Sequence, residues 1–102
     1  MTQILKEDGK TIVKPGKRID TANAVEFEKE LMPLLTEGGM SLVIDCDELT
    51  YMASSGLRII QKAMRTLVQI KGTVKMINVS PDIYKILEMT GFTRFLEVVK
   101  KK

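Results

Sequence analysis

The segment 42–68 constrains the fold most, because it joins the clearest strand pattern of the chain to its clearest helix pattern. Residues 40–44 form a short apolar run of the kind found in strands that are covered on both faces. Beyond residue 56, apolar side chains recur every three to four positions, which is the spacing of one buried helix face. The link between the two patterns ends in Ser54, Ser55 and Gly56. This link places two hydroxyl groups beside free backbone N–H groups at the positive end of a helix dipole, and it is our candidate functional site.

The rest of the chain predicts alternating strands and helices. Pro33 cannot donate a backbone hydrogen bond, so it predicts a break near Met32 in the first helix. This order predicts one α/β domain over residues 1–102, with three to four helices packed on a mixed sheet of four to five strands. The predicted elements are strands at 4–7 and 10–14 around an Asp-Gly turn, a helix capped by Asp20 or Thr21, a strand at 40–44, a helix that follows Ser54 as candidate cap, a strand at 74–79, a helix from 81 after Ser80 as cap, and a strand at 95–99.

The composition excludes several kinds of active site. The 102 residues contain no histidine, which removes Ser-His-Asp and Cys-His catalysis and imidazole metal sites. The single cysteine, Cys46, allows neither an internal disulfide nor a multi-cysteine metal cage, and at a strand end it is expected to be inert packing. No apolar run approaches the roughly 20 residues of a membrane-spanning helix, and the start of the chain lacks a signal-peptide core. We therefore expect a cytoplasmic protein.

Charged residues gather at two places in the sequence. The net charge of +3 comes largely from Lys100, Lys101 and Lys102, which predict a frayed, solvated tail rather than a nucleic-acid site, since no aromatic residues are interleaved with them. Asp45, Asp47 and Glu48 follow the strand at 40–44 and could offer oxygens to a hard cation such as Mg²⁺. Acidic residues in a loop after a strand are more typical of solvated turns, so we expect neither metal nor cofactor.

The two serines admit three interpretations. Ser54 is a good N-cap, which would require no function at all. As a nucleophile, either serine would need a base other than histidine, and no Ser-x-x-Lys spacing begins at either position. As a phosphate acceptor, Ser55 would add about −1.5 to −2 charges at a helix N-terminus, where the dipole stabilises an anion. The phosphorylated domain is therefore expected to stay folded.

The residues around the serines resemble a known family. The run 43–57 is similar to the signature of STAS domains of the anti-sigma factor antagonist type, in which a strand ends in Asp and an Asp-Ser-Ser-Gly-like element opens the next helix. Segments 18–24, 79–81 and 89–92 are similar to other parts of the family in the same order. The resemblance implies a bacterial partner switch. The unmodified protein would bind an anti-sigma factor that is also a serine kinase, and so free a sigma factor.

The resemblance also implies roles for individual residues. The kinase would phosphorylate Ser55, or as second choice Ser54, and a PP2C-type phosphatase would reverse the modification. Ala53 stands where many members of the family have Asp. The residues expected to bind the partner are Asp20, Thr21, Asn23, Asp45, Met52, Ala53, Ser54, Ser55, Gly56 and Arg58.

Other functions are compatible with the same sequence. Within the family, the alternative is an accessory STAS subunit of a lipid-transport or stress-signalling complex that does not switch by phosphorylation. A small enzyme that uses Ser55, or a phosphocarrier, is disfavoured by the absence of histidine. We therefore expect an interaction protein that is not an enzyme and binds neither nucleic acid nor membranes.

Overall fold

The computed structural model describes residues 2–7 and 9–101 and contains seven strands and three α-helices within them. The strands are β1 (Gln3–Glu7), β2 (Lys10–Lys14), β3 (Arg18–Ile19), β4 (Ser41–Asp45), β5 (Tyr51–Met52), β6 (Thr73–Val79) and β7 (Glu97–Lys100). The helices are α1 (Ala24–Leu31), α2 (Ser54–Gln69) and α3 (Pro81–Met89), with short 3₁₀ turns η1 (Met32–Leu34) and η2 (Phe92–Arg94).

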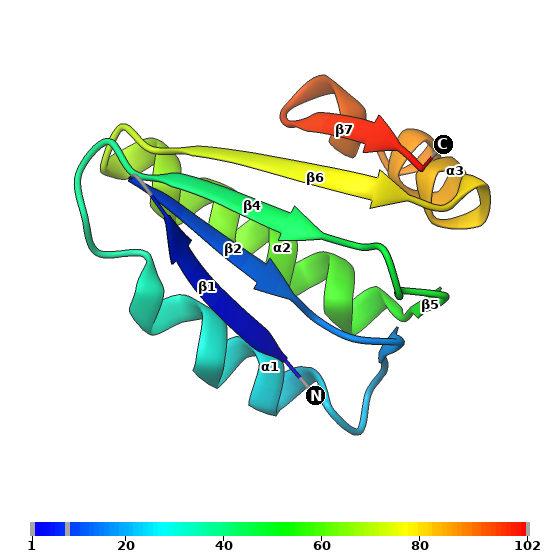
Figure 1. Ribbon diagram of the computed structural model, residues 1–102. Coiled ribbons are helices and arrows are strands. Elements are labelled where there is room, and N and C mark those ends of the chain that lie inside the picture. The colour runs from blue at the N-terminus through cyan, green and yellow to red at the C-terminus, as the bar shows by residue number, and fades with distance from the viewer. Residues whose placement is uncertain (1, 8, 102) are drawn as a thin grey trace.

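Five of the strands form one mixed sheet in the order β1-β2-β4-β6-β7. β1 pairs antiparallel with β2, and the other neighbouring strands pair in parallel. Figure 1 shows α1 and α2 together behind the sheet, with α3 beside the carboxyl end of β6. The predicted α/β class, mixed sheet and set of helices are confirmed. The Asp-Gly turn was predicted to start at Asp8, which lies outside the described residues.

The main core lies between the sheet and the helices. Val13, Ile44 and Met76 are aligned across β2, β4 and β6 and are fully buried. Because strand side chains alternate between faces, Ile12 and Val43 point to the opposite face of the sheet. The three α-helices therefore leave a second, open face whose residues include Leu5, Ile12, Val43 and Lys75 in one row across the strands.

The first helix begins later than its sequence suggested. Its N-cap is Asn23, so Asp20 and Thr21 do not cap it. Asp20 instead closes the preceding turn: its carboxylate accepts from the Asn23 N–H at 3.0 Å, and the Asn23 side chain accepts from the Asp20 N–H at 2.8 Å. This reciprocal arrangement satisfies both N–H groups one turn ahead of the helix. The break predicted from Pro33 is confirmed, because α1 ends at Leu31 and η1 follows.

The C-terminal region matches the prediction in part. Ser80 caps α3, as predicted, by accepting from the Ile83 N–H at 3.3 Å. The last strand starts at Glu97, two residues later than predicted, because Phe95 belongs to the turn after η2 and is 76% exposed.

The prediction of a frayed lysine tail is wrong for the two lysines that the structure describes. Lys100 belongs to β7, and its Nζ lies 4.4 Å from the centre of the Tyr84 ring. The Lys101 N–H donates to the Val79 carbonyl, and its Nζ donates to the Asp47 carbonyl at 2.9 Å. These contacts hold the end of the chain against the sheet; Lys102 lies outside the described residues.

Truncating the buried face of α2 should unfold the protein more easily. Ile60 is 0% exposed in the middle of that face, so Ile60→Ala leaves a cavity and should cost about 2–5 kcal/mol of unfolding free energy, measured by urea denaturation. Val68 lies on the same helix but is 74% exposed, and Val68→Ala should change stability by about 0.5 kcal/mol or less. Equal costs for the two variants would contradict this packing.

Candidate partner-binding site at the start of α2

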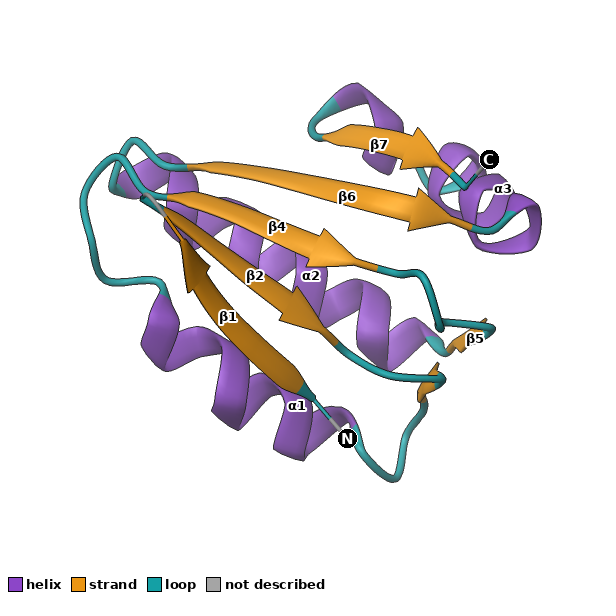
Figure 2. Ribbon diagram, in the orientation of Figure 1, coloured by secondary structure: helices purple, strands orange, loops and turns teal. Residues whose placement is uncertain are grey.

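The start of α2 is positioned by a second, very small sheet. β3 and β5 pair in parallel, with Ile19 opposite Met52, as Figure 2 shows at the carboxyl ends of the main strands. The backbone contacts continue beyond the pair. The Ala53 N–H donates to the Ile19 carbonyl at 2.8 Å, and the Thr50 N–H donates to the Lys17 carbonyl at 2.8 Å. The chain that leads into α1 and the chain that leads into α2 are therefore held side by side.

Gly56 brings α2 unusually close to this small sheet. A Cβ atom at residue 56 would lie 2.8 Å from Ile19 Cγ2 and 2.9 Å from Met52 Cγ, which is closer than carbon atoms pack. Both neighbouring side chains are buried, so they have little room to move. The absence of a Cβ atom at Gly56 therefore fixes the height of the first turn of α2 above β3 and β5.

The cap of α2 is Ala53, so the prediction that Ser54 caps this helix is wrong. Ala53 has the extended backbone of an N-cap, and its carbonyl accepts from the Gly56 and Leu57 N–H groups at 2.9 and 3.3 Å. Ser54 is consequently the first helical residue. The bond from Ala53 to Ile19 sets this boundary, because it holds residue 53 in the strand-like conformation. Ala53 offers no side-chain oxygen, and the first turn contains no acidic residue, so the positive end of the helix is not compensated.

The two serines lie in different environments. Ser54 is exposed, whereas Ser55 is half-buried. The Ser55 Oγ is covered, and within the described residues it has no hydrogen-bond partner. A buried hydroxyl without a partner costs about 1–3 kcal/mol, which favours any state in which this oxygen turns outward or gains a partner. The Ser55 hydroxyl therefore must rotate toward solvent before another protein can modify it.

A polar and aromatic cluster lies on β3, β5 and the turn before α1; because strand side chains alternate, its Arg18 and Tyr51 are on the face of the small sheet opposite to Ile19 and Met52, which contact α2. The Arg18 guanidinium lies 5.0 Å from the centre of the exposed Tyr51 ring, and Arg18 Nε donates to Asp20 Oδ2 at 3.1 Å. The Asn23 N–H, and secondarily Arg18, hold the pKa of the Asp20 carboxyl below its usual value. Asp20 is therefore ionised at neutral pH and fixes Arg18 against Tyr51.

The structure sorts the ten residues expected to bind a partner. Met52 is only 5% exposed and packs in the core, so its expected place on a contact surface is wrong. Gly56 is also buried, and its role is to let α2 pack closely on Ile19 and Met52. Arg18 and Tyr51, which lie against each other next to Asp20, were not expected from the sequence, because a strand of two residues is too short to leave a periodic signal. The other residues keep solvent contact near the start of α1 or α2, or at the end of β4; they are Asp20, Thr21, Asn23, Asp45, Ala53, Ser54, Ser55 and Arg58.

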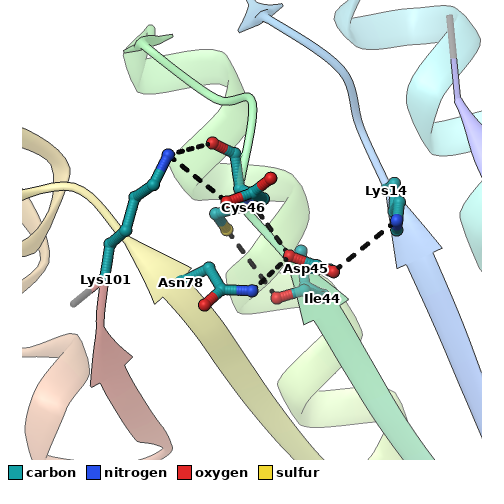
Figure 3. A network of polar contacts seen from close by, with 7 residues as sticks. Lys14, Ile44, Asp45, Cys46, Asn78 and Lys101 are labelled. Atoms are coloured by element: carbon teal, nitrogen blue, oxygen red, sulfur yellow. Dashed lines mark hydrogen bonds and ion pairs between the residues drawn. The ribbon is translucent and has the colours of Figure 1, made fainter.

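Asp45 is engaged within the domain. Its Oδ1 accepts from Asn78 Nδ2 at 3.0 Å and from the Asp47 N–H at 3.1 Å, and its Oδ2 lies 3.9 Å from Lys14 Nζ (Figure 3). These contacts tie the carboxyl ends of β2, β4 and β6 together. Asp47 pairs with Lys101 Nζ at 3.3 Å. Within residues 2–7 and 9–101, no three His, Cys, Asp or Glu side chains lie together in a way that could hold a metal ion.

Cys46 is inert packing, as predicted. Its side chain is buried in the core, and its Sγ lies 3.7 Å from the Ile44 carbonyl oxygen. Burial, with a smaller effect from the charge of Asp45, raises the pKa of the thiol to about 12. The thiolate, which is the reactive form, is therefore scarce at neutral pH. None of the helices in the described part of the chain has the length and apolar character that crossing a membrane requires.

Comparison with known proteins identifies the family. The family model described as the STAS domain matches residues 2–101. BtrV of Bordetella bronchiseptica, provisionally named as an anti-sigma factor antagonist, is 28% identical over 97 residues, which cover 95% of this chain and 84% of BtrV. The anti-sigma-B factor antagonist of Staphylococcus aureus is 27% identical over 86 residues, which cover 84% of this chain and 80% of that protein. The chain belongs to the STAS domain family, and the predicted family resemblance is confirmed.

Solved structures support the same fold. The anti-sigma factor antagonist SpoIIAA in its unphosphorylated form has a TM-score of 0.82 at 17% identity, over 96% of this chain and 87% of SpoIIAA. SpoIIAA of Bacillus in its phosphorylated form has a TM-score of 0.76 at 17% identity, over 96% of this chain and 90% of that chain. At this level of identity, the similarity establishes the fold.

Adding a carboxylate at the cap position should stabilise the domain. Ala53→Asp would let the side chain accept from a free N–H of the first turn of α2, and we expect a gain of about 0.5–2 kcal/mol in urea unfolding. Ala53→Ser should give part of this gain, and Ala53→Leu, which cannot accept, should give none. An aspartate variant no more stable than the leucine variant would contradict the assignment of Ala53 as the cap.

The Cys46 thiol should resist alkylation in the folded protein. With its pKa raised to about 12, the thiol should react with iodoacetamide at pH 8 about 1,000-fold or more slowly than in denaturant, followed by mass spectrometry. Thr50→Cys, which places a thiol at an exposed position of the same link, should add one rapidly alkylated site. Equal rates for Cys46 in folded and denatured protein would contradict its burial.

Proposed function

We propose that this protein is an anti-sigma factor antagonist that binds an anti-sigma factor through the surface at the start of α2. The observation that carries this proposal is that the first turn of α2 is held closely against β3 and β5. Ser54 and Ser55 lie on a helix end that is fixed against β3 and β5, and the same small sheet carries the Arg18–Tyr51 pair, with Asp20 bound to Arg18. The names of the relatives from Bordetella and Staphylococcus support the same function.

The binding surface in this proposal combines two loops of the same end of the molecule. The turn before α1 supplies Asp20, Thr21 and Asn23, and the start of α2 supplies Ala53, Ser54, Ser55 and Arg58. Arg18 and Tyr51 are paired across β3 and β5, the two short strands that lead into these groups. Asp45 is mainly a structural residue in this proposal, since its oxygens bind Asn78, Asp47 and Lys14. No step of the proposed function requires catalysis, so the protein acts as a binding module in the bacterial cytoplasm.

Phosphorylation of Ser55 is the proposed switch. The anti-sigma factor would act as the serine kinase, and a PP2C-type phosphatase would remove the phosphate. A dianion on Ser55 meets uncompensated N–H groups in the first turn of α2, with Arg58 one turn further along the helix. This environment stabilises the phosphate, so modification should leave the helix intact. SpoIIAA, which has been solved in both states, retains this fold when phosphorylated.

The loss of partner binding must then arise at the interface. A phosphate at residue 55 stands where the partner would pack closely. On binding, the phosphate would lose its water without gaining a cation from the partner. Such desolvation, together with any nearby carboxylate of the partner, supplies the few kcal/mol that abolish micromolar binding. We prefer Ser55 to the more exposed Ser54 because Ser55 matches the acceptor position of the family. In addition, the covered Ser55 Oγ gains hydrogen-bond partners only by turning outward.

A phosphate mimic at residue 55 should separate folding from binding. Ser55→Asp should keep the circular dichroism spectrum of the native protein and melt at the same or a slightly higher temperature, yet weaken binding to the anti-sigma factor by about 100-fold or more, measured by calorimetry. Ser55→Ala should bind as the native protein does. Gln69→Asp has the same change in charge at the exposed far end of α2 and should also bind normally. A Ser55→Asp variant that unfolds, or that binds as well as the native protein, would refute the proposed switch.

Mass spectrometry identifies the modified serine and tests the alternative functions. Incubation with the anti-sigma factor and ATP should add one phosphate to Ser55 and none to the Ser55→Ala variant. Phosphate on Ser54 instead would move the switch by one residue. Protein that stays unmodified would favour the accessory STAS subunit without phosphoswitching, and modification by ATP without a second protein would favour autonomous chemistry.

A further inference from the structure

We infer that the free edge of β1 is a self-association site, at which a second copy of this chain pairs antiparallel with β1 about a two-fold axis at Leu5. The pairing would join the two five-stranded sheets into one continuous sheet. Edge strands expose unpaired backbone N–H and C=O groups, which are a template for another strand. This inference concerns a surface away from Ser55 and does not depend on the proposed function.

β1 has the properties of an edge that is open to pairing. It lies at one end of the strand order, as Figure 1 shows, and all five of its residues are exposed. Its pairing with β2 runs from Gln3 to Glu7 without a bulge. Two of its exposed residues are apolar, Ile4 at 39% and Leu5 at 48%. A regular edge with exposed apolar side chains is the kind of strand on which a second strand can be added.

The opposite edge of the same sheet is protected. β7 has four residues, and its pairing with β6 shifts register between Met76 and Val79. Each edge strand carries two charges, Lys6 and Glu7 in β1 and Glu97 and Lys100 in β7, so the difference between the two edges is the register of their pairing. Irregular register is one of the features by which natural sheets prevent edge-to-edge pairing. The contrast indicates that β1 is the edge available for a second chain.

The face of the sheet that the helices leave uncovered carries apolar side chains up to the β1 edge. Leu5 is opposite Ile12, and Ile12 is opposite Val43, so three apolar side chains form a row that runs out to the β1 edge. Val43 is buried at 8% exposure and Ile12 is half-buried, whereas Leu5 at the end of the row is 48% exposed. A second β1 strand would place its own Leu5 against this residue. The apolar row would then continue from one molecule into the next.

The sequence of β1 selects the register of this pairing. A two-fold axis perpendicular to the sheet must place one residue opposite its own copy. With Leu5 on the axis, all five residues pair: Gln3 faces Glu7, and Ile4 faces Lys6. With Lys6 on the axis, two like charges would face each other, and with Ile4 on the axis, Glu7 would have no opposite residue in β1. Only the register centred on Leu5 uses the whole strand without a like-charge pair.

This geometry has consequences for affinity and for the other site. Five paired residues bury less surface than the roughly 1,200–2,000 Å² of a standard interface, so we expect a dissociation constant on the order of 10⁻⁴ M. The two-fold axis reverses the strands, which places the Ser55 sites of the two copies toward opposite ends of the joined sheet. Pairing through β1 therefore leaves both sites accessible.

The test is sedimentation velocity of the full chain over about 10 µM to about 1 mM. The native protein should move from monomer to dimer over this range, and the backbone amide NMR signals of residues 3–7 should shift with concentration. Leu5→Lys places two lysines on the axis and should leave the protein monomeric. Val68→Lys introduces a lysine at an exposed position of α2 and should dimerise as the native protein does.

A charge exchange tests the register itself. Gln3→Glu would face Glu7 of the second copy twice in each dimer and should weaken dimerisation several-fold; within its own sheet residue 3 is opposite Lys14, so the new charge does not disfavour the β1–β2 pairing. The double variant Gln3→Glu/Glu7→Gln removes the like-charge pair and should dimerise about as the native protein does. Circular dichroism of each variant confirms that it is folded. A native protein that stays monomeric at about 1 mM, a dimer that persists in Leu5→Lys, or a Gln3→Glu variant that associates as tightly as the native protein would overturn the inference.

Discussion

The close contact between Gly56 and the small β3–β5 sheet is the constraint on which the candidate site depends. Because residue 56 has no Cβ atom, the first turn of α2 rests directly on Ile19 and Met52. The same two residues are paired in β3 and β5, so the contact also locks together the segments that lead into α1 and α2. A surface assembled from two distant loops thereby becomes rigid, which lowers the entropic cost of binding a partner.

The second property of the site is an unbalanced charge at the start of α2. Ala53 provides no capping oxygen, the first turn has no acid, and the Ser55 hydroxyl is covered without a partner. Each of these features is slightly unfavourable for the unmodified domain. All three would be relieved by an anion attached to Ser55, since phosphate oxygens can accept from the free N–H groups. The absence of a cap carboxylate is therefore compatible with a phosphate switch, because the phosphate itself can supply the missing negative charge.

The acidic residues at the end of β4 have a different role. Asp45 connects three strands through Asn78, Asp47 and Lys14, and Asp47 holds Lys101 at the end of the chain. These side chains are used by the fold itself. They leave the serines and the Arg18–Tyr51–Asp20 cluster as the surface groups that are available to a partner.

The sequence by itself determined the α/β class, the break at Pro33 and the cap at Ser80, because these depend on local periodicity and turn chemistry. Only the tertiary structure decided that Ala53 rather than Ser54 caps α2, that Met52 is buried, and that Lys101 is bound. Each of these depends on a partner far away in the sequence: Ile19 for Ala53 and Met52, Val79 and Asp47 for Lys101. Contacts between distant segments leave no periodic pattern in a single sequence, and the fold alone brings them together.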